Sequence, residues 1–336
     1  MNKVTYLLGA GASCGALPMV KDFAERVLKF KREVLPSRVG EVYGFPGQPY
    51  PKEYLLPPSG TFGKLLLESL EWLGEEAQRH FSIDTYAKTL SFRNDEKARE
   101  LLNKLKSTLS CYLLLEQSLK PVDKRYGKFF AKILTRKPDG IPLLPEGVNI
   151  VTWNFDTQPE KSYKEFCAHP SYVDEGITRG AHNIIRLNGI CGQPYKTDTK
   201  DLCYLEFSKS FFESVLNLFK NHMDPNVLGY RPQILFAWER GDLLTKDVER
   251  IKGTTTLVVI GYSFPDFNED IDKVLFEVMV PTLEKVFIQV PGSEHSVVQK
   301  NLLKLFKNES DKKAIKDKIE MLARTDLFYI PDDMPR

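Results

Sequence analysis

The chain has 336 residues, of which 42% are hydrophobic and 27% are charged. These ordinary proportions exclude wholesale disorder, a fibrous repeat and a long coiled coil. Lys and Arg together number 47 against 45 for Asp and Glu, a formal net charge of +2. No global field therefore draws the chain toward nucleic acid or an anionic membrane, and we predict no direct nucleic-acid site.

The apolar runs and the cysteines bear on the compartment of the protein. The apolar runs at residues 6–11 and 257–261 fall well below the roughly 20 residues of a membrane-spanning helix, and the N-terminus shows no signal-peptide pattern. We predict a cytoplasmic protein without membrane contact. The five cysteines include no C-x-x-C pair, so they fit neither a disulfide framework nor a four-thiolate zinc site, and we predict free thiols.

The N-terminal region has the pattern of a strand, a glycine turn and a helix. Residues 4–8 form a short apolar run, a glycine-rich cluster spans residues 9–15, and an amphipathic stretch covers residues 20–30. Residues 36–60 contain six prolines, a composition that continues neither helix nor strand, so we predict a long excursion or lid there. Residues 61–134 carry leucines at three- and four-residue spacing and are predicted to form an all-helical insertion.

The second half of the chain combines strand-like and helical patterns. Strands are predicted at residues 148–153, 183–187, 233–236, 255–260 and 285–290, and helices at 268–280 and 296–306. Several of these strands are continuously apolar, as strands covered on both faces are. We therefore predict an α/β fold: a Rossmann-like parallel sheet with helices on both faces and a helical insertion after the first βα unit. Residues 1–35 and 135–336 would form the core, and residues 36–134 the Pro-rich excursion and the insertion.

The turn at residues 9–15 (GAGASCG) predicts nucleotide binding or, alternatively, a tight structural turn. Glycines between a first strand and a helix let backbone N–H groups approach a pyrophosphate at the helix N-terminus. The spacing here is G-x-G-x-x-x-G, with the third glycine one residue later than in the common dinucleotide fingerprint. No acidic residue is clearly placed about 20 residues further on to hold a ribose.

Two other polar clusters follow predicted strands. Residues 152–156 (TWNFD) follow the second strong strand, and residues 261–266 (GYSFPD) follow the most apolar strand. Because parallel sheets bind ligands outside the carboxyl ends of their strands, we expect the three clusters to meet in one crevice.

With these motifs the chain resembles a sirtuin-type NAD-binding domain, and most closely the sirtuin-like NADase effectors of bacterial anti-phage defence systems. The resemblance is carried by GAGAS (residues 9–13) with Gly15 and Pro18, by TWNFD at the family's T-x-N-x-D, by IIRLNG (residues 184–189) at its L-H-G segment, and by IGYSFPD (residues 260–266). These motifs stand in the family's order and span most of the chain.

The resemblance implies that NAD is a substrate and that the matched residues form the site. No zinc is expected, because the paired C-x-x-C spacing of the deacetylases' zinc module is missing. The resemblance places Ala10, Gly11 and Ser13 by the pyrophosphate and ribose, and Asn154 and Asp156 by the nicotinamide ribose. The NAD-binding candidates, of which the last three would lie by the adenosine half, are Gly9, Ala10, Gly11, Ala12, Ser13, Gly15, Pro18, Thr152, Gly261, Tyr262 and Ser263. Two structural alternatives stay open: Asn154 as a turn residue that caps the next helix, and Ser263 as a helix cap.

The main departure from the family pattern is Asn188, which stands where the family has histidine. Asparagine can orient a ribose hydroxyl or a water, but it cannot take a proton near pH 7. His182 lies at the opposite end of the predicted strand and is a poor substitute. Either the reaction needs no base here, and Asn188 joins Asn154 and Asp156 as a catalytic candidate, or the domain binds NAD without turning it over.

The leading hypothesis is an NAD+ glycohydrolase (NADase) that releases nicotinamide and ADP-ribose, a reaction that needs a stabilised oxocarbenium ion rather than a strong base. The resemblance implies an antiviral, abortive-infection effector activated by homo-oligomer assembly or by a partner such as an ATPase, an Argonaute-like protein or another sensor. One alternative is a catalytically weakened NAD or ADP-ribose sensor or structural subunit. A protein lysine deacylase is the third, and the missing C-x-x-C zinc module disfavours it. The lysine-rich segment 300–318 is a partner-facing helix or, by the plainer interpretation, a solvated helix face.

Overall fold

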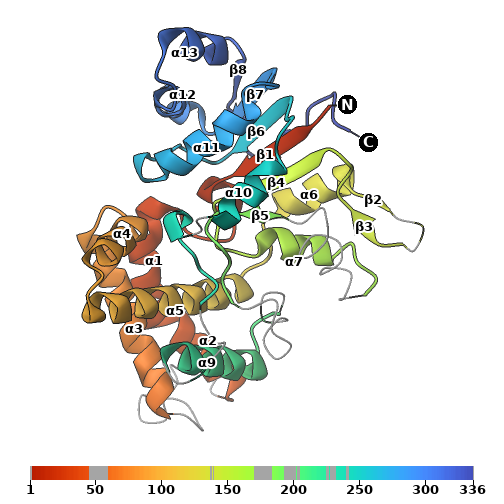
Figure 1. The fold of residues 1–336 in the computed structure, drawn as a ribbon. Coiled ribbons are helices and arrows are strands. Elements are labelled where there is room, and N and C mark those ends of the chain that lie inside the picture. The colour runs from red at the N-terminus through yellow and green to blue at the C-terminus, as the bar shows by residue number, and fades with distance from the viewer. Residues whose placement is uncertain are drawn as a thin grey trace.

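The computed structural model describes residues 2–44, 60–136, 138, 140–169, 184–192, 202, 205–224, 227, 232–239 and 242–335. Its centre is a six-stranded sheet in the order β5-β4-β1-β6-β7-β8, in which every neighbouring pair is parallel (Figure 1). The strands are β1 (Val4–Leu8), β4 (Val148–Thr152), β5 (Ile185–Arg186), β6 (Thr256–Ile260), β7 (Lys285–Gln289) and β8 (Ile319–Leu322). Counted within this sheet, the order is 3-2-1-4-5-6, as in dinucleotide-binding Rossmann folds. The short strands β2 (Thr135–Arg136) and β3 (Pro142–Leu143) form a separate antiparallel pair.

The central strands are mostly apolar and almost entirely buried because both of their faces are covered. β1 pairs with β4 on one side and with β6 on the other, in a register that sets Leu8 opposite Thr152 and Ile260. All five residues of β1 and of β6 are buried. The three strands end at one level, so the segments that follow them start from the same edge of the sheet.

Helices cover both faces of the sheet. One face carries α6 (Lys124–Ile133) and α7 (Gln158–Lys164), and the other carries α10 (Asp242–Glu249), α11 (Glu269–Met279) and α12 (His295–Lys304). Successive side chains of β1 point to opposite faces, so Tyr6 packs with α6 and α7 while Leu7 packs with the other three helices. The predicted α/β fold with a Rossmann-like parallel sheet between two helical layers is confirmed.

A further group of helices shares its own core beside the sheet, at the lower left of Figure 1. We call it the helical unit, and it consists of α1 (Phe23–Lys29), α2 (Leu35–Val42), α3 (Gly60–Arg79), α4 (Ile83–Arg93), α5 (Glu96–Ser118) and α9 (Lys209–Met223). The predicted insertion supplies α3, α4 and α5, whereas α6 from the same stretch packs on the sheet. α9 comes from a distant part of the chain and packs against α3 and α5.

Two of the predicted elements are wrong. Residues 36–42 belong to α2, where we predicted the start of an excursion. Pro36 is tolerated in the first turn of α2 because a wider π-helical turn (Phe30–Val34) precedes it and leaves room for the proline ring. The rest of that excursion, residues 45–59, lies outside the described residues. The predicted strand at residues 233–236 makes only an isolated antiparallel bridge, from Ile234, because its apolar side chains are buried in the core of the helical unit instead of pairing in the sheet.

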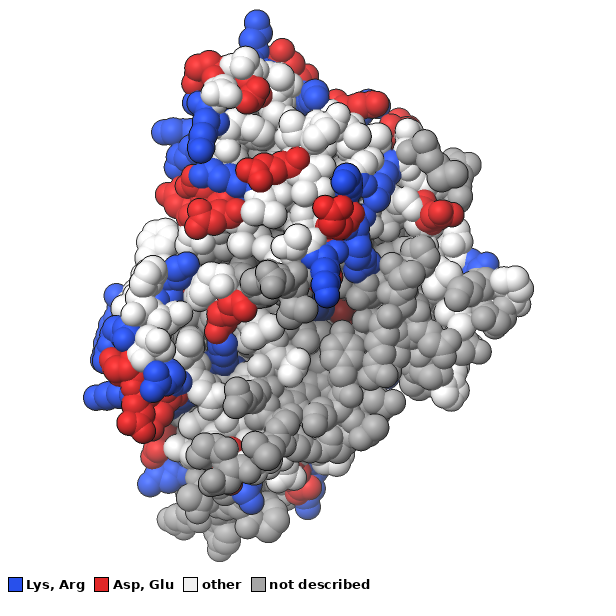
Figure 2. Space-filling view, in the orientation of Figure 1, with Lys and Arg blue, Asp and Glu red and all other residues white. Residues whose placement is uncertain are grey.

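The lysine-rich segment 300–318 forms the end of α12, a turn and α13 (Glu309–Lys316) instead of one helix. Its side chains Lys304 and Lys312 pair with Asp266 and Glu309 at 3.1 and 2.6 Å. Figure 2 likewise shows Lys and Arg interspersed with Asp and Glu on the face in view. The mixture of charges is that of a solvated surface. In the part of the chain that the structure describes, no helix combines the length and the apolar character needed to cross a membrane.

Candidate functional site

A cavity of about 210 Å³ lies between the carboxyl edge of the sheet and the helical unit. Its sheet-side wall comes from the segments that follow β1, β4, β5 and β6, and its helix-side wall comes from the corner between α3 and α4 and from α5. Nine predicted site residues line it: Ala10, Ser13, Pro18, Asn154, Asp156, Asn188, Gly261, Tyr262 and Ser263. The other five candidates, Gly9, Gly11, Ala12, Gly15 and Thr152, do not line it. The three polar clusters expected to meet therefore lie around one cavity.

The glycine turn is pressed against the end of β6. The N–H of Gly9 donates to the Ile260 carbonyl at 3.0 Å, that of Gly11 to the Gly261 carbonyl at 2.9 Å, and that of Ala12 returns to the Gly9 carbonyl at 2.9 Å. A Cβ on Gly11 would lie 2.7 Å from the Gly261 Cα, which is too close for a side chain. The close contact between the glycine turn and the end of β6 thus requires glycine at these positions. The three backbone N–H groups form hydrogen bonds within the chain and are not available to a pyrophosphate.

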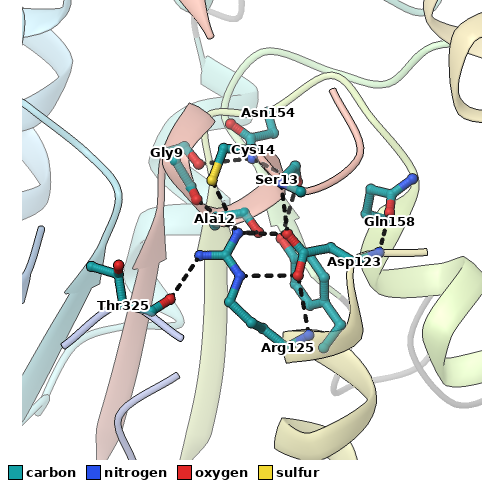
Figure 3. A network of polar contacts seen from close by, with 12 residues as sticks. Gly9, Ala12, Ser13, Cys14, Asp123, Arg125, Asn154, Gln158 and Thr325 are labelled. Carbon is teal, nitrogen blue, oxygen red and sulfur yellow. Dashed lines mark hydrogen bonds and ion pairs between the residues drawn. The ribbon is translucent and has the colours of Figure 1, made fainter. Parts of the chain in front are cut away.

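A buried ion pair at the start of α6 also holds the glycine turn (Figure 3). Arg125 pairs with Asp123 at 2.5 Å and donates to the carbonyls of Gly11 and Ala12 at 3.0 and 3.2 Å. Asp123 in turn accepts the N–H of Gly15 at 3.0 Å. Burial alone would raise the pKa of the Asp123 carboxyl, but hydrogen bonds from Arg125 hold it below its usual value. No motif indicated this pair, because it lies in the stretch predicted as a helical insertion.

Asn154 is oriented by hydrogen bonds from its own amide group. Its Nδ2 donates to the Gly9 carbonyl at 2.9 Å and to Ser13 Oγ at 3.3 Å (Figure 3). Its backbone N–H donates to Thr152 Oγ1 at 3.0 Å. These bonds use the donors, and among the described residues none donates to Oδ1, so an acceptor remains at the cavity. Asn154 does not cap the next helix, α7, whose N-cap is Thr157.

Asp156 contributes a buried carboxyl to the same wall. It is 4% exposed, and its Oδ1 accepts the N–H of Gln158 at 2.9 Å. Burial raises the pKa of Asp156 to about 6, against the lowering effects of that hydrogen bond and of the charge on Arg186. Arg186 also donates to the carbonyls of Asp156 and Asn154 at 2.9 and 3.2 Å and pairs with buried Glu160. A carboxyl that titrates near neutrality in a cavity can stabilise positive charge or take a proton.

Asn188 lines the cavity but is tied to the neighbouring loop. It is buried, and its Nδ2 donates to the Trp153 carbonyl at 3.1 Å. Its backbone carbonyl accepts the N–H of Leu235 at 3.0 Å. Among the described residues that line the cavity there is no His, Lys or Arg. The wall therefore offers amides, hydroxyls and carboxyls, without the imidazole of the family pattern.

The segment after β6 is fixed by internal contacts. The Tyr262 hydroxyl donates to Asp272 Oδ2 at 2.7 Å, and burial raises the pKa of Asp272 well above its usual value. Phe264 has a φ of 51°, a left-handed conformation that is strained for a bulky side chain. Ser263 is exposed at the cavity, and the helical turn that follows is capped by Pro265 instead. Ser263 is thus free of the capping role that was its structural alternative.

The helix-side wall carries one carboxyl, Asp84, that the motifs did not indicate. Ser82 caps α4 by accepting the N–H of Thr85 at 3.1 Å, and the cavity is lined by Asp84 in the same first turn. Burial raises the pKa of Asp84 to about 6. Phe81 lines the cavity beside it and is 85% exposed. An acidic residue after a serine cap is an ordinary helix start, so no sequence signal distinguished this one.

Comparison with known proteins adds no relative. A scan against protein-family models found no match, and a search of curated proteins found no significant match. The functional interpretation therefore depends on the motifs, the fold and the geometry of the cavity.

Proposed function

We propose that the chain is a sirtuin-like NAD+ glycohydrolase, with NAD as its substrate and with nicotinamide and ADP-ribose as its products. The observation that carries the proposal is a cavity in which Asn154 presents Oδ1 and Asp156 presents a carboxyl. This cavity lies at the carboxyl edge of a sheet with dinucleotide-binding strand order. Ligands of such sheets bind at that edge, where the strand order reverses.

The proposed reaction breaks the bond between the nicotinamide nitrogen and C1′ of the ribose. The bonding electron pair leaves with nicotinamide, whose ring becomes neutral, and positive charge spreads over C1′ and the ribose ring oxygen. The Asp156 carboxylate opposes that charge, and Asn154 Oδ1 accepts a hydrogen bond from a ribose hydroxyl or from the attacking water. Water adds at C1′, and its proton passes to a carboxylate and then to solvent. The leaving group departs as a neutral molecule and needs no acid, and the water attacks an oxocarbenium ion, so the reaction needs no strong base in the position of Asn188.

A second candidate, an NAD or ADP-ribose sensor or structural subunit, is favoured by Asn188 itself. Its amide nitrogen is committed to the Trp153 carbonyl, and the described cavity-lining residues include no histidine. A site of this kind binds the dinucleotide without efficient turnover. The two candidates differ in one observable, the release of nicotinamide.

For the active enzyme we propose a cytoplasmic antiviral role in which NAD is depleted during abortive infection. A permanently active NADase is toxic to its own cell, so activity would await assembly. The activating event is formation of a homo-oligomer or binding of a partner such as an ATPase, an Argonaute-like protein or another sensor. The support for this part of the proposal is the resemblance in sequence motifs.

The test is to incubate the purified chain with NAD, alone and with the product of the neighbouring gene, and to quantify nicotinamide and ADP-ribose. Equal release of both products above the spontaneous rate supports hydrolysis. Saturable binding of NAD in calorimetry without nicotinamide release supports the sensor. The absence of both binding and release would overturn both candidates.

A further inference from the structure

The α3–α4 corner brings to the cavity a carboxyl and an aromatic ring that no other side chain of the described residues pairs with. Asp84 lies in the first turn of α4 and lines the cavity. Its carboxyl accepts a hydrogen bond from its own backbone N–H, but among the described residues no side chain hydrogen-bonds or pairs with it. Phe81, on the same corner, lines the cavity while leaving 85% of its surface exposed. A large exposed aromatic side chain beside an unpaired carboxyl suits a flat ring that carries positive charge.

The charge balance of the cavity points to the same kind of ligand. Its described lining residues include two carboxyls, Asp84 and Asp156, and no Lys, Arg or His. Tyr262 lines the opposite wall, and the charge of Asp84 is the smallest of the causes that raise the pKa of Tyr262. Such an enclosure repels phosphate and attracts a cation. Burial raises the pKa of both carboxyls to about 6, which leaves them mostly ionised above neutrality.

The size of the cavity limits what it can hold. About 210 Å³ is less than the roughly 300–1,000 Å³ of pockets that enclose whole ligands, so it takes only part of a dinucleotide. NAD+ has one cationic part, the nicotinamide ring, while its pyrophosphate is anionic. The acidic cavity therefore suits the nicotinamide end, and the pyrophosphate would lie outside it.

We propose that Asp84 and Phe81 of the helical unit form a receptor for the cationic nicotinamide ring, so that the site selects oxidised NAD+ over neutral NADH. The inference rests on the proposed function for the identity of the ligand, but it does not require turnover. Asp84 and Phe81 are specificity-determining residues in this scheme. The sheet-side residues bind the ribose, and the two side chains of the helical unit distinguish the cationic ring of NAD+ from the neutral ring of NADH.

The experiment is calorimetry of the full chain with three probes. These are the carbocyclic analogue of NAD+, which keeps the cationic ring but resists hydrolysis, together with NADH and ADP-ribose. Asp84→Asn keeps the size of the side chain and removes its charge. Glu96→Gln is the matched control, because it removes an exposed carboxyl from the first turn of the next helix, α5, away from the cavity.

We expect wild type and Glu96→Gln to prefer the cationic analogue over NADH. Asp84→Asn should weaken binding of the analogue about fivefold, as loss of one partly exposed charge pair does, and leave ADP-ribose unchanged. An unchanged ratio between the analogue and NADH in Asp84→Asn, or an equal loss for ADP-ribose, would overturn the inference. Selective binding of the analogue, together with no nicotinamide release when NAD+ itself is the substrate, would contradict the hydrolase while supporting the receptor. Absence of binding by all three probes would overturn both.

Discussion

The two walls of the cavity differ in how their polar groups are used. On the sheet-side wall, Asn154, Asp156 and Asn188 each make hydrogen bonds to the chain, and the glycine turn behind them has several amides engaged. On the helix-side wall, the Asp84 carboxyl interacts with its own backbone N–H, but no side chain among the described residues bonds to it, and Asp84 and Phe81 both line the cavity. The side chains of the sheet-side wall are therefore fixed by hydrogen bonds within the chain, whereas those of the helix-side wall remain available to contact a ligand.

The largest expected effect comes from crowding the contact between the glycine turn and the end of β6. Gly261 has a φ of +60°, and a Cβ there would lie 2.4 Å from backbone atoms of Gly11, so Gly261→Ala should lower the free energy of unfolding by at least about 3 kcal/mol. Gly253→Ala is the control, because Gly253 has a φ of +80° but its nearest neighbour lies 4.0 Å away; it should cost about 1 kcal/mol. Urea unfolding measures the free energy of unfolding of both variants. Equal losses would show that the contact between the glycine turn and the end of β6 does not restrict position 261.

The next effect concerns the acceptor on the sheet-side wall. Asn154→Ala removes Oδ1 from the cavity and the bond to Gly9, so nicotinamide release should fall about 100-fold while the free energy of unfolding falls by about 1 kcal/mol. Asn149→Ala removes an amide from β4, the strand that precedes Asn154, away from the cavity, and should leave turnover unchanged. The assignment fails where Asn154→Ala retains full turnover in an otherwise active protein.

A third test uses the pH dependence of stability. The pKa of Asp156 rises from about 3.9 when unfolded to about 6 when folded, so the folded chain binds this proton more tightly. The free energy of unfolding should therefore fall as the pH rises from about 4 to 6, with Asp156 accounting for about 2 kcal/mol. Asp156→Asn keeps the Oδ1 acceptor and should flatten the profile by that amount in urea unfolding at several pH values. Identical pH profiles for wild type and Asp156→Asn would contradict the burial of a titrating carboxyl at this position.

The smallest expected effect compares two exposed aromatic side chains. Phe81 and Phe92 are 85% and 79% exposed, but only Phe81 is among the residues that line the cavity. Phe81→Ala and Phe92→Ala should each change the free energy of unfolding by less than about 0.5 kcal/mol. Phe81→Ala alone should weaken binding of the cationic NAD+ analogue, by about threefold, because it removes the ring face beside Asp84. Equal binding by the two variants in calorimetry would assign no role to Phe81.

The sequence predicted the strands that are both buried and paired in the sheet. It failed where an apolar segment is buried without pairing in the sheet. β1, β4, β6 and β7 are mostly apolar, mostly buried runs and were predicted to within one residue at each end. The run at residues 233–236 is equally apolar, but it packs in the helical unit, and hydrophobicity alone does not distinguish these outcomes. β8 was missed because it is a short edge strand with half-buried and exposed side chains.

The sequence by itself determined the parallel sheet and the polar residues at its carboxyl edge, because strand periodicity and glycine turns are local properties. Only the tertiary structure decided how those residues are used. Because the glycine turn packs against Gly261, backbone N–H groups that the motif suggests for a ligand form hydrogen bonds within the chain. The helical unit places Asp84 on the same cavity as Asp156. Such contacts join segments far apart in the chain, so their charge and hydrogen-bond balance emerges only once the core has assembled.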